Sequence, residues 1–447
     1  MRTLEPALLA ALTALAFTAC PPPPGSCATT GNGSIVVTFA GLPSGVNGSV
    51  TATGFERTTG ERSSVQTLTM GQTLIVTAGN WGISAEKVIV DDPLVRTVYT
   101  PRISAPNFCL AKDATQAVDV TWSVVKTSNT LWVGNGSGGT GTTQGFAAAG
   151  LRSTSTLAST FGGNLAASRS ITFDKDGNVW ALGNTVSDPL VARFPADAFT
   201  TGTVPMPDRS INIAGITCVP ATKALAFDAE GNLYVASSCK KELYKLPAAS
   251  LGGSGTVAPA LTIASFQAID GLAFDKNGNL WVADGVTDEL LRFDASALSG
   301  TSASPTRRIK ARKSDQPADL TALKPDMLAF DKDGNLWSYD FGLNLVFSIA
   351  AADLMGSGMA NTTPTVRISI PVSAVMEGLA FDEGGGLWLP FSAGKLARLA
   401  PAQLTVSSGA GAPTMPDTII TGSSLGSAQG PAIYPAPKGT PLFHALP

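Results

Sequence analysis

One twelve-residue phrase occurs five times in this chain, and no other feature constrains the fold as strongly. The copies begin at Ile171, Leu225, Leu272, Leu328 and Leu379, and the third of them reads LAFDKNGNLWVA. Their aromatic anchors are Phe173, Phe227, Phe274, Phe330 and Phe381, at gaps of 54, 47, 56 and 51 residues. A repeat of this period indicates one small unit that is used many times around a shared core.

Each copy has the pattern of a β-hairpin. Two apolar runs flank a turn such as Asp174–Asn178, and Gly in such a turn adopts positive φ without steric cost. We expect the leading Asp to accept hydrogen bonds from the N–H groups of its own turn. Large side chains alternate on both faces, as in Leu280–Val282, so the sheet must be covered on both sides. A blade of a β-propeller, held between two neighbours, meets this requirement.

Each repeat is predicted to contain four strands. A third strand follows every hairpin, and four of the five copies carry a basic residue at its fourth position: Arg193, Lys245, Arg292 and Arg398. We interpret this basic position as the mark of an outer, more solvated strand. A stretch rich in Gly, Ser and Ala and then a short fourth strand complete the unit.

Counting the two hairpin strands separately gives the number of blades. The aromatic residue of the second strand occurs at Trp180, Tyr234, Trp281, Trp337 and Trp388, and once upstream at Trp132. The first strand has instead a downstream candidate, Gly430–Tyr434, whose Tyr434 lies 53 residues after Phe381. We therefore predict an all-β, six-bladed β-propeller over residues 128–447, closed by a C-terminal strand around 430–434. Seven blades are the alternative, if residues 100–128 and the tail build another one.

The chain ahead of the propeller divides into three predicted parts. Residues 1–19 have the pattern of a lipoprotein signal peptide, and Cys20 would be lipidated; a plain cleaved signal with an incidental cysteine is the alternative. Residues 20–31 form a linker with a stiff proline run. Residues 32–126 contain alternating β segments, such as Val118–Val124, and predict a small immunoglobulin-like β-sandwich. It resembles the small immunoglobulin-like modules of bacterial surface lipoproteins, and this resemblance implies a stalk, with carbohydrate or protein contact as the alternative role.

These features predict an exported, membrane-anchored lipoprotein on the periplasmic or surface face of an outer membrane. Export permits disulfides, and the predicted pairs are Cys27 with Cys109 and Cys218 with Cys239.

The net charge of −3 gives no electrostatic case for binding nucleic acid. The one basic run, Arg307–Lys313, is interpreted as a solvated loop. We expect a monomer.

Residues able to carry chemistry are few. The single histidine, His444, lies three residues from the C-terminus, which argues against histidine relays and multi-histidine metal sites. Carboxylates lie where strands enter and leave the ring: Glu377, Asp270 and Asp326 at the entries, and Asp284 and Asp340 at the exits. Together they are a candidate site for one divalent cation, calcium or zinc. The alternative is that they are ordinary solvated loop acids.

The phrase Gly271–Asp284 resembles the repeats of NHL, SMP-30/gluconolactonase and streptogramin lyase propellers. The resemblance extends over about residues 128–440. It implies a metal-dependent hydrolase or lactonase in the SMP-30 case, and Glu377-Gly378 is similar to the Glu-Gly of that family. Streptogramin lyases use a catalytic histidine, which only His444 offers here. We favour a non-catalytic, envelope-anchored scaffold that binds a protein or glycan, with the lactonase as the alternative.

Overall fold

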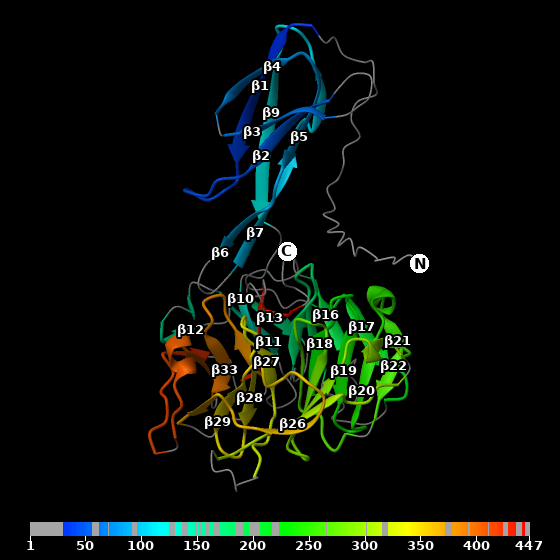
Figure 1. Cartoon of the computed structure of the whole chain (residues 1–447), viewed down its shortest axis with the longest axis vertical. Coiled ribbons are helices and arrows are strands. Elements are labelled where there is room, and N and C mark those ends of the chain that lie inside the picture. The colour runs from blue at the N-terminus through cyan, green and yellow to red at the C-terminus, as the bar shows by residue number, and fades with distance from the viewer. Residues whose placement is uncertain are drawn as a thin grey trace, which may run out of the picture. The chain divides into compact units, whose positions relative to one another are not determined.

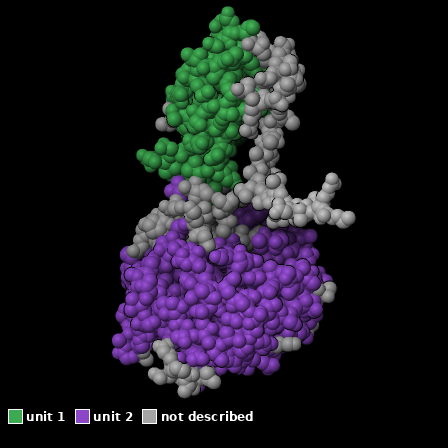
Figure 2. Space-filling model, viewed as in Figure 1, with its two compact units in different colours: residues 1–89, 98–125 green, residues 90–97, 126–447 purple. Residues whose placement is uncertain are grey.

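The structure is a computed structural model, and it describes the chain from residue 30 to residue 442 with gaps. The described residues are 30–55, 62–69, 71–91, 96–124, 130–135, 142–147, 150–151, 153–157, 161–164, 170–183, 191–195, 206–216, 223–264, 266–300, 302–314, 321–371, 378–391, 394–409, 411–422, 428–434 and 440–442. They fall into two compact units, coloured separately in Figure 2. Each unit is described by itself below.

The first unit is a β-sandwich of two sheets. One sheet has the order β4-β1-β9-β7-β6 and the other β3-β2-β5-β8. The strands are β1 (Asn32–Ala40), β2 (Val50–Phe55), β3 (Arg62–Leu68), β4 (Thr73–Thr77), β5 (Gly79–Ala85), β6 (Val88–Asp91), β7 (Arg96–Ile103), β8 (Asn107–Leu110) and β9 (Thr115–Val124). The alternation predicted for β9 is found at Val118, Val120 and Trp122, which are buried, but Val124 at its end is 47% exposed.

The second unit contains six sheets among its described residues, and Figure 1 shows them arranged as a β-propeller. The first sheet, β36-β10-β11-β13, consists of β36 (Ala428–Tyr434), β10 (Thr130–Asn135), β11 (Thr142–Ala147) and β13 (Phe161–Asn164). The second, β14-β15-β16-β17-β21, consists of β14 (Ile171–Phe173), β15 (Val179–Leu182), β16 (Val191–Phe194), β17 (Arg209–Ile213) and β21 (Gly255–Val257). The third, β18-β19-β20-β22, consists of β18 (Ala224–Phe227), β19 (Leu233–Ser237), β20 (Glu242–Leu246) and β22 (Leu261–Ile263).

Three more sheets complete the ring. The fourth, β23-β24-β25-β26-β30, consists of β23 (Gly271–Phe274), β24 (Leu280–Asp284), β25 (Glu289–Phe293), β26 (Arg307–Ala311) and β30 (Gly358–Thr362). The fifth, β27-β28-β29-β31, consists of β27 (Leu328–Phe330), β28 (Leu336–Asp340), β29 (Leu345–Ile349) and β31 (Val366–Ser369). The sixth, β32-β33-β34-β35-β12, consists of β32 (Ala380–Phe381), β33 (Leu387–Phe391), β34 (Lys395–Leu399), β35 (Thr418–Gly422) and β12 (Ser155–Leu157).

The repeated phrase supplies the two innermost strands of five sheets, and its turn is fixed by the leading carboxylate. Asp275 accepts hydrogen bonds from the N–H groups of Asn277 and Asn279, from the Asn279 amide and from the Trp281 indole, at 2.9–3.1 Å. The Asn279 Oδ1 in turn accepts from the N–H of Ala295, just after the third strand. The expectation that this Asp folds onto its own turn is therefore confirmed, and the turn acid also orients the large buried aromatic residue.

Adjacent blades pack through the aromatic residues of the phrase. Trp180 lies edge-on to Phe227 of the next blade, with ring centroids 5.6 Å apart, and Tyr234 meets Phe274 in the same way at 5.1 Å. The residue directly opposite the second-strand aromatic is always small, as Ala273 is opposite Trp281. A small residue leaves room for the indole to reach the neighbouring blade, so the phrase encodes the contact between blades as well as the hairpin.

The C-terminal strand β36 pairs with β10, so residues from both ends of the second unit share one sheet. The register differs by one residue from the sequence alignment. Ala432 lies opposite Trp132, and Ile433 lies opposite Leu131, the position that a Phe occupies in the other blades. Tyr434 instead points toward Phe173 of the next blade, with ring centroids 5.2 Å apart. The match of Tyr434 with Phe381 was therefore wrong, because an aromatic residue is not required on the closing strand.

Each of three blades receives a fifth, parallel strand from the blade that follows it. The pairs are β21 on β17, β30 on β26 and β12 on β35. These additions cover the outer strand of the preceding sheet, which is otherwise an open edge. The outer loops are also held by the basic residues of the third strands: Arg292 donates to the carbonyls of Leu354 and Gly356, and Lys245 to that of Leu298.

The basic position of the third strand was interpreted from the sequence as solvated, and this interpretation was wrong. The side chains of Arg292 and Lys245 are only 12% and 17% exposed. The basic run beginning at Arg307 is likewise a strand, β26, and not a loop. Arg307 donates to the carbonyls of Ser357 and Asp353, and these bonds bring the loop of the next blade against the strand.

The cysteines are only partly described. Cys109, in β8, and Cys239, in the turn after β19, are both disulfide-bonded. Cys20, Cys27 and Cys218 lie outside the described residues, as do the signal and the linker, so lipidation and the two pairings stay predictions. Among the helices of the described part of the chain, none is long and apolar enough to cross a membrane.

Candidate functional site

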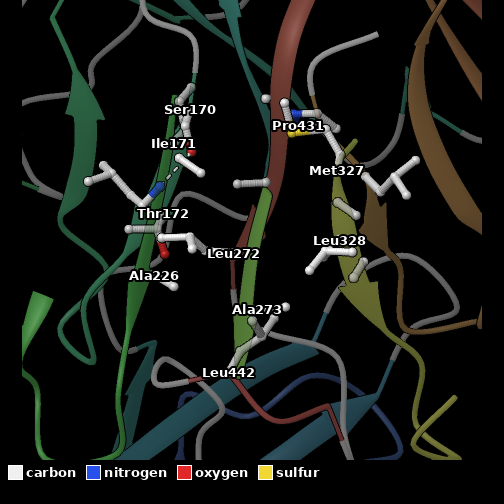
Figure 3. Close-up of a pocket in the computed structure, with 18 of the residues that line it drawn as sticks. Ser170, Ile171, Thr172, Ala226, Leu272, Ala273, Met327, Leu328, Pro431 and Leu442 are labelled. Atoms are coloured by element: carbon white, nitrogen blue, oxygen red, sulfur yellow. Dashed lines mark hydrogen bonds between the residues drawn. The ribbon is translucent and has the colours of Figure 1, made fainter. Parts of the chain in front are cut away.

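The innermost strands enclose a central channel with an apolar wall. Its cavity volume is about 140 Å³. All six inner strands line it, and the middle residue of each is small: Thr172, Ala226, Ala273, Ala329, Ala380 and Ala432. Most of these are partly exposed, and the Leu and Phe on either side of them, which also line the cavity, are buried. Figure 3 shows Thr172, Ala226 and Ala273 around the channel.

Two of the predicted metal ligands, Asp284 and Asp340, accept hydrogen bonds from the loops around them. Asp284, at the end of β24, is 2% exposed, and its carboxylate accepts hydrogen bonds from the N–H groups of Gln267, Ala268, Val286 and Thr287 at 2.9–3.2 Å. These bonds join the loop that enters the blade to the loop that leaves it. The oxygen lone pairs that a cation needs are thereby directed to backbone donors.

Asp340 occupies the same position in the next blade. It is also 2% exposed, and it accepts from the N–H groups of Lys324 and Leu343 at 2.9 and 3.0 Å. In the third sheet the equivalent residue is Ser237, whose hydroxyl accepts from the Lys240 N–H at 3.3 Å. The three residues therefore share one task, which is to hold the loop between the second and third strands.

Asp270 precedes β23 and bridges two blades. Its carboxylate lies 3.5 Å from Nζ of Lys223, which precedes β18 in the neighbouring blade. Burial raises the pKa of Asp270, and this shift is opposed by the charge of Lys223 and by a backbone hydrogen bond from Gly285. Asp270 is thus an acid that is paired with a lysine of the neighbouring blade, and among the described residues it does not belong to a group of three or more metal-binding side chains.

The remaining candidates are placed as follows. Asp326 precedes β27, and its backbone N–H donates to the carbonyl of Tyr339 at 3.0 Å. Its charge is one of the causes that raise the pKa of Tyr339, after burial of the phenol. Glu377 and His444 lie outside the described residues. Among the described residues, no group of three or more acidic, His or Cys side chains is arranged to hold a metal ion.

The hairpins that connect second and third strands form exposed tips at this end of the ring. Three of them contain a non-glycine residue in the left-handed region, Lys241, Asp288 and Asn344, with φ between 51° and 58°. Two tips also expose apolar side chains, with Val286 at 66% and Phe341 at 53%. Sequence reasoning did not identify these positions, although their signal is a large apolar residue inside a turn.

The fold defines this chain as a β-propeller protein that also contains a β-sandwich. No family model and no curated protein matches the sequence. Among solved structures, a streptogramin B lyase matches 53% of this chain and 66% of its own, at 16% identity and a TM-score of 0.34. The chain thus spans about two thirds of that lyase.

Two other solved structures are similar at the same low level. A putative gluconolactonase matches 50% of this chain and 70% of its own, at 15% identity and a TM-score of 0.34. A protein of unknown function from Bacteroides caccae matches 65% and 97%, at 12% identity and a TM-score of 0.40. The fold assignment therefore stands on the sheets of this chain.

Proposed function

We propose that this protein is an envelope-anchored β-propeller lipoprotein that binds a protein or glycan and does not act on it catalytically. The observation that supports this most is the engagement of the acids at the channel entrance. Asp284 and Asp340 are bonded to backbone N–H groups, and Asp270 is paired with Lys223. A carboxylate that accepts hydrogen bonds from loop N–H groups or pairs with a lysine is less available to exchange protons or to bind a cation.

The binding surface we propose is the set of apolar hairpin tips at the same end of the ring, Val286, Phe341 and Leu343. Apolar and aromatic side chains on short, well-held loops lose little entropy on binding, which makes them suitable contact residues. The loops are held by Asp284 and Asp340, so the engaged acids and the exposed tips belong to one arrangement. The anchor at Cys20 would keep this surface at the membrane.

The alternative, a metal-dependent lactonase, is tested by metal analysis and turnover on the purified protein. We expect less than stoichiometric calcium and zinc and no hydrolysis of γ- and δ-lactones with either metal added. The variant Glu377→Ala is the control, because Glu377 is the residue that resembles a metal ligand. Bound metal that this variant loses, together with lactone turnover by the parent, would overturn the proposal.

The binding role is tested with the variant Val286→Ser/Phe341→Ser. We expect that glycan arrays or cross-linking in envelope fractions show a partner for the parent and at least tenfold weaker capture by the variant. A variant at the exposed Met355, Met355→Ser, is the matched control and should bind like the parent. Equal capture by all three proteins would place the contact elsewhere and contradict the proposed surface.

A further inference from the structure

The two ends of the central channel differ. Ser170, Met327 and Pro431 lie at the end where the inner strands begin, and Leu442 lies at the other (Figure 3). Leu442 belongs to Thr440–Leu442, a segment that follows the last strand and lines the channel. Thr440 is 7% exposed and fixes the start of this segment, whereas the side chain of Leu442 is 44% exposed. The chain therefore places one of its own aliphatic side chains at one end of its channel.

The wall between these ends carries methyl groups in place of charges. In the described part of the chain, five of the six middle residues of the inner strands are Ala and one is Thr, and no charged side chain lines the cavity. One backbone N–H of an inner strand, that of Leu225, donates a hydrogen bond to Oγ of Ser170 at 3.2 Å and is therefore satisfied within the protein. An apolar surface of this kind gains free energy when it is covered by another apolar group.

We propose that the channel is a binding pocket for a short alkyl chain, with Leu442 as its floor. The cavity of about 140 Å³ suits this ligand class, because an engineered apolar cavity of roughly 150 Å³ in another protein takes up benzene. A slender chain can pass between the small residues, whereas a branched or charged molecule meets the ring of methyl groups. The pocket is separate from the hairpin tips discussed above and does not depend on their function.

A series of n-alcohols from propanol to decanol, titrated into the full-length protein by calorimetry, tests the pocket. We expect affinity to rise about fourfold for each added methylene, the factor that burial of one CH₂ provides. The rise should stop at a limiting length, when the alkyl chain reaches Leu442. Deletion of residues 440–447 should move that limit to longer alcohols, and Leu442→Trp should move it to shorter ones.

Ala329→Leu should weaken every alcohol by at least tenfold, since it narrows the ring. The matched control is Ala352→Leu on an exposed loop, which should bind like the parent. Far-UV circular dichroism and the melting temperature establish that each variant is folded; if Ala329→Leu is not, Leu442→Trp carries the test. Affinities that do not rise with alcohol length would show a channel that holds only water and would overturn the proposal. A limiting length that is the same in the parent, the deletion and Leu442→Trp would overturn it as well, because Leu442 would then not be the floor.

Discussion

The turn aspartate orders the inner hairpin of the five blades that contain the repeated phrase. It accepts hydrogen bonds from two N–H groups of its own turn in the first four copies, and from the indole of the second strand in every copy except the second, which has Tyr234; Asp275 and Trp281 are an example. The last copy, with Asp382, shows that the turn aspartate is satisfied even where the turn asparagine is missing. Gly386 replaces the usual Asn there, and Arg398 bonds Asp382 from the space that the Asn side chain leaves. The carboxylate is thus kept satisfied by a different partner.

Asp275→Ala should destabilise the propeller unit by about 3 kcal/mol, because it removes charge-assisted hydrogen bonds and leaves the buried Trp281 indole without its acceptor. Urea unfolding followed by tryptophan fluorescence measures the change. Lys276→Ala, in the same turn but exposed, is the control and should stay within about 0.5 kcal/mol of the parent. Calcium should change neither midpoint, since the turn is complete without a cation; a calcium-dependent midpoint in the parent would contradict this.

Asp270 should make stability depend on pH. Its pKa is raised in the folded protein, so the folded state holds the proton more tightly than the unfolded state does. The contribution of this group to stability is therefore present at low pH and is lost as pH rises from about 3.9 through the raised pKa. Asp270→Asn should remove this part of the slope in urea midpoints measured between pH 3.5 and 7. An unchanged slope would mean that another acid causes it.

At the level of single residues, sequence reasoning identified turn chemistry and missed the role of the exit acids. Asp275 was predictable because all its partners lie within six positions of it. Asp284 was not, because it bonds Gln267 and Ala268, about 17 positions earlier, and that closeness exists only once the blade has formed. An acid at a strand end looks the same in sequence whether it faces a cation or a backbone donor.

Among the elements, the closing strand β36 packs very closely against its neighbour in the ring, β32. Gly378, just before β32, has φ of 120°, and a Cβ on it would lie 2.6 Å from the Cα of Gly430 in β36. A side chain at Gly378 would therefore push apart the two inner strands where the ring closes. Gly271 meets the same limit, 2.4 Å from the carbonyl of Asp326, so close approach is a general property of the inner strands.

Gly378→Ala should lower the free energy of unfolding of the propeller unit by at least about 2 kcal/mol, because the backbone conformation and the space both exclude a Cβ. Gly411→Ala is the matched control, since no atom lies within 4 Å of its added Cβ and its φ is not in the left-handed region. Urea midpoints for both variants decide this. Equal midpoints would show that the strands β32 and β36 can move apart at Gly378 without a loss of stability.

The strands themselves were predictable, and their surroundings were not. Alternation and turn residues locate the hairpins because they act over a few positions. The burial of Arg292 depends instead on carbonyls of Leu354 and Gly356, more than 60 positions away. The parallel strands β21, β30 and β12 were not predicted for a similar reason. Their sequences have no strand pattern of their own, and they pair with strands of the neighbouring blade that are distant in sequence.

On the scale of the whole molecule, the apolar cores of the two units are separate. Among the described residues, the buried core of the sandwich lies between Ile35 and Trp122, and the buried cores of the blades lie between Leu131 and Tyr434. Each unit can therefore fold on its own core. Residues 126–447 expressed alone should give the same urea midpoint for the propeller transition as the full chain, within about 0.3 M. A fragment that remains unfolded would show that the sandwich is needed.

The pairing of β36 with β10 also fixes an order of events during synthesis. In that sheet, β10, β11 and β13 are among the first strands of the propeller to be made, and the innermost strand β36 is among the last. While the chain grows, β10 has no neighbour on its inner side, and every later blade can be complete before the first one is. The ring is therefore finished only after β36 has been made, and a chain that stops before Ala428 has an unsealed sheet.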